Sequence, residues 1–64
     1  MNQPKTLRER EKELQSLLAT PAGRREIEAL AARYSEASGK MKPVRTSTVT
    51  FILVHEREKG LIDG

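Results

Sequence analysis

The chain has 64 residues and no cysteine, which excludes disulfide frameworks, thiolate zinc sites and dithiol redox motifs. Hydrophobic residues make up 36% and aromatic residues 3% of the sequence, so we expect a small aliphatic core and no deep ligand pocket. The formal net charge is +3, and this excess lies in residues 37–55, where Lys40, Lys42 and Arg45 have no acidic neighbour.

The first predicted element is a helix over about residues 7–18, preceded by a flexible tail at residues 1–5. Thr6 and Glu9 have the spacing of a capping box, in which each side chain bonds to the backbone amide of the other residue. Leucines then recur at helical spacing, which predicts one apolar side for this helix: Leu7, Leu14, Leu17 and Leu18.

A second helix is predicted over residues 21–38. Thr20 is a suitable N-cap, and Pro21 suits the first helical position because no amide hydrogen is needed there. Gly39 stands where a left-handed residue often ends a helix. Because the connection to the first helix is so short, the two helices are predicted to fold back on each other as a hairpin.

The third segment, residues 44–59, supports two interpretations. Its first half is rich in β-branched residues, which favours a strand, and a strand with no other candidate in the chain would pair with a copy of itself. Its second half contains strong helix formers and ends at Gly60, which favours a helix over about residues 47–59. We prefer the helix because it can cover the hairpin within one chain.

Together these elements predict an all-α fold, a single small three-helix domain in which a hairpin is closed by a third helix. The alternative is two helices plus one strand that pairs in a dimer. In the all-α fold, the core is predicted from the residues that share the inward faces: Leu14, Leu17, Leu18, Ile27, Leu30, Ala31, Tyr34, Val49, Ile52, Leu53 and Leu61.

No residue cluster predicts catalysis, so we expect no enzyme activity, no cofactor, no metal site and no small-molecule substrate. The glycines are isolated, and the single histidine, His55, would need Glu36 nearby to form even a minimal acid–base pair. No segment approaches the roughly 20 apolar residues of a membrane span, and the charged N-terminus lacks the apolar stretch of an export signal. A cytoplasmic location without membrane contact is therefore expected.

The leading functional hypothesis is a non-enzymatic interaction module. Residues 49–54 carry more apolar side chains than one small hairpin can cover. We therefore expect this module to self-associate or to bind a protein partner through Val49, Phe51 and Val54.

The alternative hypothesis is an accessory protein that binds nucleic acid. Lys40, Lys42 and Arg45 precede a run of hydroxyl side chains, and cations beside hydroxyls suit phosphate contacts. Arg24 and Arg25, in the first turn of the second helix, are further candidates for such contacts.

Two resemblances accompany these patterns. Residues 56–62, Glu-Arg-Glu-Lys-Gly-Leu-Ile, resemble the helix-to-strand junction of many winged-helix DNA-binding proteins, although no wing hairpin follows them. The chain as a whole resembles short, uncharacterised bacterial proteins that share its Thr-Pro-x-Gly-Arg helix start at residues 20–24 and its Gly-Leu-Ile end. The second resemblance implies no activity.

Overall fold

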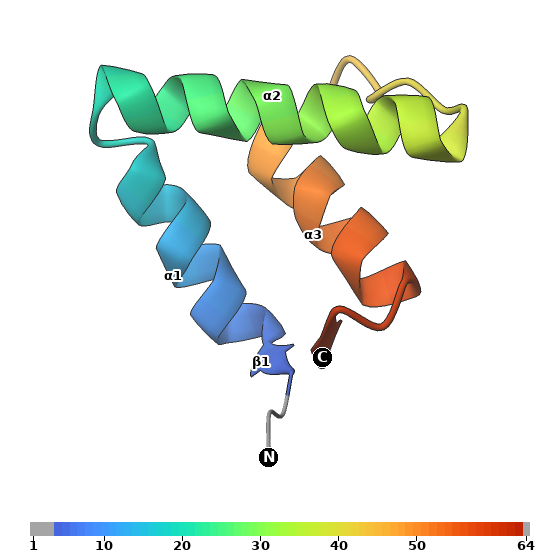
Figure 1. Cartoon of the computed structure of the whole chain (residues 1–64), viewed down its shortest axis with the longest axis horizontal. Helices are drawn as coiled ribbons and strands as arrows, with labels where there is room; N and C mark the ends of the chain where they lie inside the picture. The colour runs from blue at the N-terminus through green and yellow to red at the C-terminus, as the bar shows by residue number, and fades with distance from the viewer. Residues whose placement is uncertain (1–3, 64) are drawn as a thin grey trace.

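The computed structural model describes residues 4–63, which form three helices and one short parallel sheet (Figure 1). The predicted all-α, three-helix fold is confirmed, and each helix begins and ends within one residue of the range expected from the sequence. The elements in chain order are β1 (Lys5–Thr6), α1 (Leu7–Leu17), α2 (Pro21–Ser38), α3 (Thr48–Glu58) and β2 (Ile62–Asp63).

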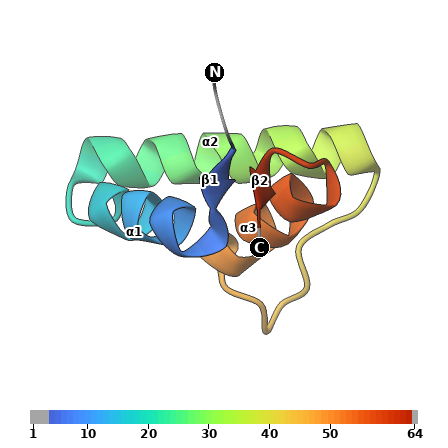
Figure 2. The same ribbon diagram turned by 90° about the horizontal axis from the view of Figure 1, so that it is seen from below.

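The helices do not pack as the predicted antiparallel hairpin with a third helix laid into its cleft. Instead α2 lies across one end of α1 and α3, which run down from it on the same side (Figures 1 and 2). Each helix contacts the other two. α1 and α2 diverge because α3 fills the angle between them, where Ile52 packs with Leu14 and Ile27 in the core.

At the start of each helix a side chain accepts a hydrogen bond from one of the free backbone amides, and the caps at Thr6 and Thr20 are those that the sequence predicts. The capping box is present, with the Glu9 amide 3.2 Å from the Thr6 hydroxyl oxygen and the Thr6 amide 3.3 Å from the Glu9 carboxylate. The Thr20 hydroxyl accepts from the amide of Gly23 at 3.0 Å. At the start of α3, Ser47 accepts from Thr50 at 3.1 Å.

The strand interpretation of residues 44–54 is wrong, because α3 covers residues 48–58. The strands lie at the two ends of the described chain and pair with each other, with Lys5 opposite Ile62. Lys5 is therefore part of the sheet, whereas we expected it in the tail; residues 1–3 of that tail lie outside the described residues.

The turn between α3 and β2 shows that one predicted core residue, Leu61, is wrong. Gly60 has φ 74°, and the amide of Leu61 reaches the carbonyl of Glu56 at 2.9 Å, the pattern of a glycine-ended helix. This turn leaves Leu61 half exposed and directs Ile62 inward. Five predicted core residues are buried together with Ile62, namely Leu14, Ile27, Val49, Ile52 and Leu53, while the others pack around them: Leu17, Leu18, Leu30, Ala31 and Tyr34.

None of the described helices combines the length and the apolar character that crossing a membrane requires.

Candidate functional site: the groove between α2 and α3

A network of three side chains joins all three helices. Glu56 on α3 is only 3% exposed, and Arg10 on α1 meets its carboxylate in two parallel hydrogen bonds, Nε to Oε1 and Nη2 to Oε2, both 2.8 Å. The hydroxyl of Tyr34 on α2 donates to Oε2 of the same carboxylate at 2.6 Å. We call these residues the Arg10–Tyr34–Glu56 network.

The network changes the acidity of its members. Burial alone would raise the pKa of Glu56, but the hydrogen bonds from Arg10 and Tyr34 outweigh it and hold that pKa below its ordinary value. Burial and the hydrogen bond to Glu56 raise the pKa of Tyr34 to about 12. The hydrogen bond to Glu56 likewise raises the pKa of Arg10. Glu56 is therefore a carboxylate, and Tyr34 a neutral phenol, at physiological pH.

The sequence analysis missed this network, although a signal for it exists. Glu56 follows Val49, Ile52 and Leu53 at helical spacing, so it belongs to the buried face of α3. Arg10 similarly stands between leucines on the inward side of α1. Charged residues on apolar helical faces point to a buried ion pair.

His55 does not form the acid–base pair considered from the sequence. Its ring stacks on that of Tyr34, with centroids 4.2 Å apart and planes inclined by 17°. Glu36 is exposed on α2 and does not line the groove that His55 lines. Within residues 4–63 there is also no group of three histidine, aspartate or glutamate residues placed to hold a metal ion.

On the other side of α3, its outward residues and the end of α2 enclose an open groove of about 300 Å³, which we call the α2–α3 groove. Its apolar lining comes from Ala37, Phe51 and Val54, and His55 also lines it. Charged side chains stand around this apolar centre, and they are Lys40, Glu58 and Lys59. A groove with an apolar centre and a charged rim has the composition of a protein-binding surface.

Two of the three residues predicted to form an interaction face line this groove. Val54 is 49% exposed and Phe51 is half-buried. The prediction that Val49 is an interaction residue is wrong, since its side chain is 5% exposed and belongs to the core. The reason is helical geometry, which places Val49 on the face of Ile52 and away from Phe51 and Val54.

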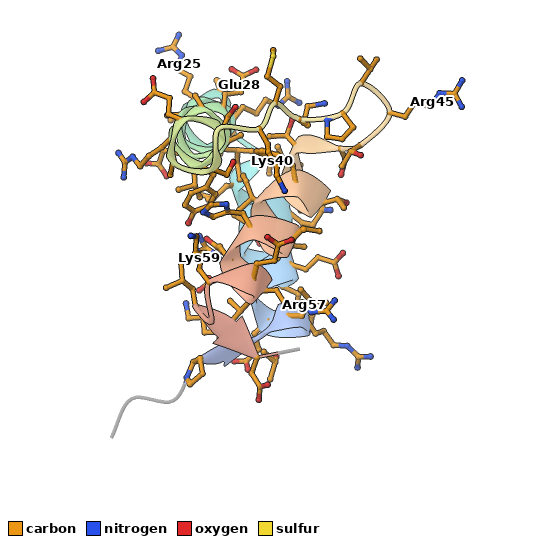
Figure 3. The ribbon with its side chains drawn as sticks, turned by 90° about the vertical axis from the view of Figure 1, so that its right-hand side faces the viewer. Arg25, Glu28, Lys40, Arg45, Arg57 and Lys59 are labelled. Atoms are coloured by element: carbon orange, nitrogen blue, oxygen red, sulfur yellow. The ribbon has the colours of Figure 1, made fainter. Side chains whose placement is uncertain are left out.

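The five cations predicted to contact an anion do not gather on one surface. Lys42 donates to the Thr46 carbonyl at 2.7 Å, and Arg24 donates through Nε to a carbonyl at the end of α1 at 3.0 Å. Arg25 and Arg45 point away on opposite sides of the molecule (Figure 3). Lys40 alone among the five lines the α2–α3 groove.

The loop between α2 and α3 carries two further exposed apolar side chains. Met41 is 86% exposed and Val44 is 97% exposed. The loop projects away from the helices when the molecule is seen from below (Figure 2). It begins at Lys40, so its first residues adjoin the groove.

No protein-family model, no curated protein and no solved structure matches this chain.

Proposed function

We propose that this protein is a non-enzymatic interaction module that binds a protein partner in the α2–α3 groove. The observation that carries the proposal is the placement of Phe51 and Val54. The opposite face of α3 already supplies Val49, Ile52 and Leu53 to the core, so these two outward side chains are not needed to hold the helix in place. Apolar residues exposed together in a hollow are typical of sites where another molecule packs.

The nucleic-acid alternative has less support. Arg24 and Lys42 donate to backbone carbonyls, and Arg25 points away from Arg45, so few of the cations remain together for phosphate contacts. Three or fewer such contacts would give weak binding that is lost as salt increases. The apolar lining of the groove would also contribute little to the binding of a phosphate backbone.

A photo-crosslinking amino acid at position 54 tests the proposal in the full chain. We expect a discrete protein adduct from position 54 and none from position 32, an exposed alanine on α2 outside the groove. Purified wild-type protein added in excess should compete the adduct away. Equal labelling from both positions, or no adduct from position 54, would contradict the proposal.

Light scattering at micromolar concentration then tells whether the occupant is a second copy. A dimer that Val54→Arg converts to a 7.2 kDa monomer would identify self-association through the groove. A wild-type monomer that still yields the adduct would identify a different protein as the partner.

A further inference from the structure

We propose that the α2–α3 groove takes an acidic segment of a partner protein, whose apolar side chains pack on Phe51 and Val54 while its carboxylates pair with Lys40 and Lys59. This inference rests on the proposed function and names the chemistry of the partner. Three observations support it. The groove carries more positive than negative side chains, several other cations already have partners within the fold, and a second copy of the chain has no excess of negative charge.

The two lysines on the rim come from different elements. Lys40 follows the end of α2, and Lys59 follows the end of α3. Both are exposed, both line the groove, and neither forms an ion pair with any residue in the range 4–63. Two cations held apart around an apolar centre match a segment that carries acidic residues on both sides of an apolar anchor.

Four other cations of the molecule are engaged within the fold. Lys5 pairs with Glu13, and Arg10 pairs with both Glu13 and Glu56. Lys42 and Arg24 donate to backbone carbonyls. Unlike these four, Lys40 and Lys59 have no such contact in residues 4–63, and both line the apolar groove, where they are available to an outside anion.

The acidic residue on the rim does not cancel this charge. Glu58 is one carboxylate beside two lysines, and residues 37–55, which include most of the groove lining, contain no acidic residue. One carbonyl at each helix end is already hydrogen-bonded, that of Ser35 to the amide of Gly39 and that of Glu56 to the amide of Leu61. The groove is therefore cationic on balance.

A second copy of the chain fits this groove less well than an acidic partner does. Residues 1–36 carry seven basic and six acidic side chains, so no net negative charge is available from that half. The whole chain has a net charge of +3, which makes two copies repel each other at low salt. Charge complementarity therefore favours a different, acidic protein.

Selection of random peptides displayed on phage against the purified protein supplies the probe. We expect the selected peptides to combine aspartate or glutamate with aliphatic or aromatic residues. Their dissociation constants would be measured by fluorescence anisotropy with synthetic, labelled copies. Binding should weaken as salt rises, because exposed charge pairs are screened.

A pair of matched double variants isolates the role of the two lysines. Lys40→Glu with Lys59→Glu changes the net charge from +3 to −1, and Arg25→Glu with Arg57→Glu does the same at exposed positions outside the groove. Figure 3 shows Arg25 and Arg57 pointing away from Lys40 and Lys59. We expect binding to weaken about tenfold or more in the groove variant and by less than about twofold in the control.

Val54→Arg separates this inference from the proposed function, because it blocks the apolar centre without adding negative charge. Its control is Val44→Arg, the same substitution on the exposed loop. Neutral or basic peptides that lose binding in Val54→Arg alone would contradict the acidic partner and leave the groove intact as a binding site. Peptides unaffected by Val54→Arg, or no selected peptides at all, would contradict both proposals.

Binding of a duplex oligonucleotide tests the nucleic-acid alternative, and circular dichroism checks that each variant is folded. Binding of the duplex at physiological salt that is lost in the Lys40 and Lys59 variant would contradict a peptide occupant and favour nucleic acid. Each variant must keep the helical spectrum of the wild type. Because all the substituted positions are exposed, we expect every variant to pass this check.

Discussion

The two sides of α3 use ionisable residues in opposite ways. On one side Glu56 is buried, and both of its carboxylate oxygens are hydrogen-bonded to side chains from α1 and α2. On the other side Lys59 stands at the rim of an open groove without an ionic partner in the described part of the chain. Glu56 and Lys59 are three positions apart in the sequence, yet the first stabilises the fold and the second lines a surface groove.

The difference shows why charge alone does not locate a binding site. A buried ion pair with satisfied hydrogen bonds is built to hold one arrangement of helices, and breaking it is costly. Exposed, unpaired cations beside apolar side chains contribute little to the fold and remain available to a ligand. The two regions should therefore respond oppositely to substitution: the network should change stability, and the groove should change binding.

Removing the Glu56 carboxylate should have the largest effect on the fold. Glu56→Ala leaves the Tyr34 hydroxyl without its acceptor and the Arg10 guanidinium with Glu13 alone, and losing one partner of a buried pair costs about 3 kcal/mol or more. For a domain of 64 residues this approaches the whole free energy of unfolding, on the order of 3–10 kcal/mol. Circular dichroism with urea unfolding measures the loss.

Glu58→Ala is the matched control, two residues along the same helix and exposed in the groove. Its unfolding free energy should stay within about 0.5 kcal/mol of the wild type. If Glu56→Ala unfolded at the same urea concentration as this control, the contrast between the two sides of α3 would be wrong.

The next largest loss of stability is expected at Gly23. This residue has no charge, so it shows how much stability the fold owes to close packing of α1 and α2 alone. A Cβ atom at this position would lie 1.9 Å from the carbonyl oxygen of Leu17, so α1 and α2 could not keep their present approach. Gly23→Ala should therefore cost about 2–3 kcal/mol, after the helix propensity gained from alanine. Gly39→Ala, which meets no atom within 4 Å but needs φ 70°, should cost about 1 kcal/mol.

Local rules were enough to predict the helices but not the sites. Thr20, Pro21 and Gly39 act through their immediate neighbours, so the bounds of α2 follow from the sequence. The pairing of Lys5 with Ile62 depends instead on how the helices bring the chain ends together. Two-residue strands have no sequence pattern that could reveal them in advance.

The candidate site was partly predictable for the same reason. Helical spacing identifies Phe51 and Val54 as outward neighbours on α3, but not that Lys40 and Lys59 surround them. Lys59 lies far from Lys40 in the sequence and in a region of mixed charge. The sequence does not identify it because Lys40 and Lys59 come to the same groove only through the packing of α3 against the end of α2.

A smaller effect should appear at Tyr34 in alkaline solution. Its pKa is raised to about 12, above the ordinary value of about 10, so the neutral phenol is the form that the fold prefers. The stability it contributes is fully present below about pH 10 and is lost as the pH rises towards 12. Tyr34→Phe should remove this alkaline loss and cost about 1.5 kcal/mol at neutral pH.

The absorbance of tyrosinate measures the titration directly, because the chain contains one tyrosine and no tryptophan. In Glu56→Gln the midpoint should fall but stay above about 10, since the charge is gone while the burial remains. An unchanged midpoint would mean that Glu56 does not act on Tyr34, and a wild-type midpoint near 10 would contradict the network itself.

The smallest change in stability is expected at Val54, which tests whether the groove side of α3 serves binding and not the fold. Val54→Arg replaces a half-exposed β-branched residue with a good helix former, so the unfolding free energy should shift by less than about 0.5 kcal/mol. Binding of the selected peptides should nevertheless be lost, since the arginine stem covers the apolar centre between Phe51 and Ala37. Urea unfolding and fluorescence anisotropy on the same preparation give both values. Destabilisation by more than about 1 kcal/mol would show that Val54 supports the fold, and the groove would then resemble the network side of α3.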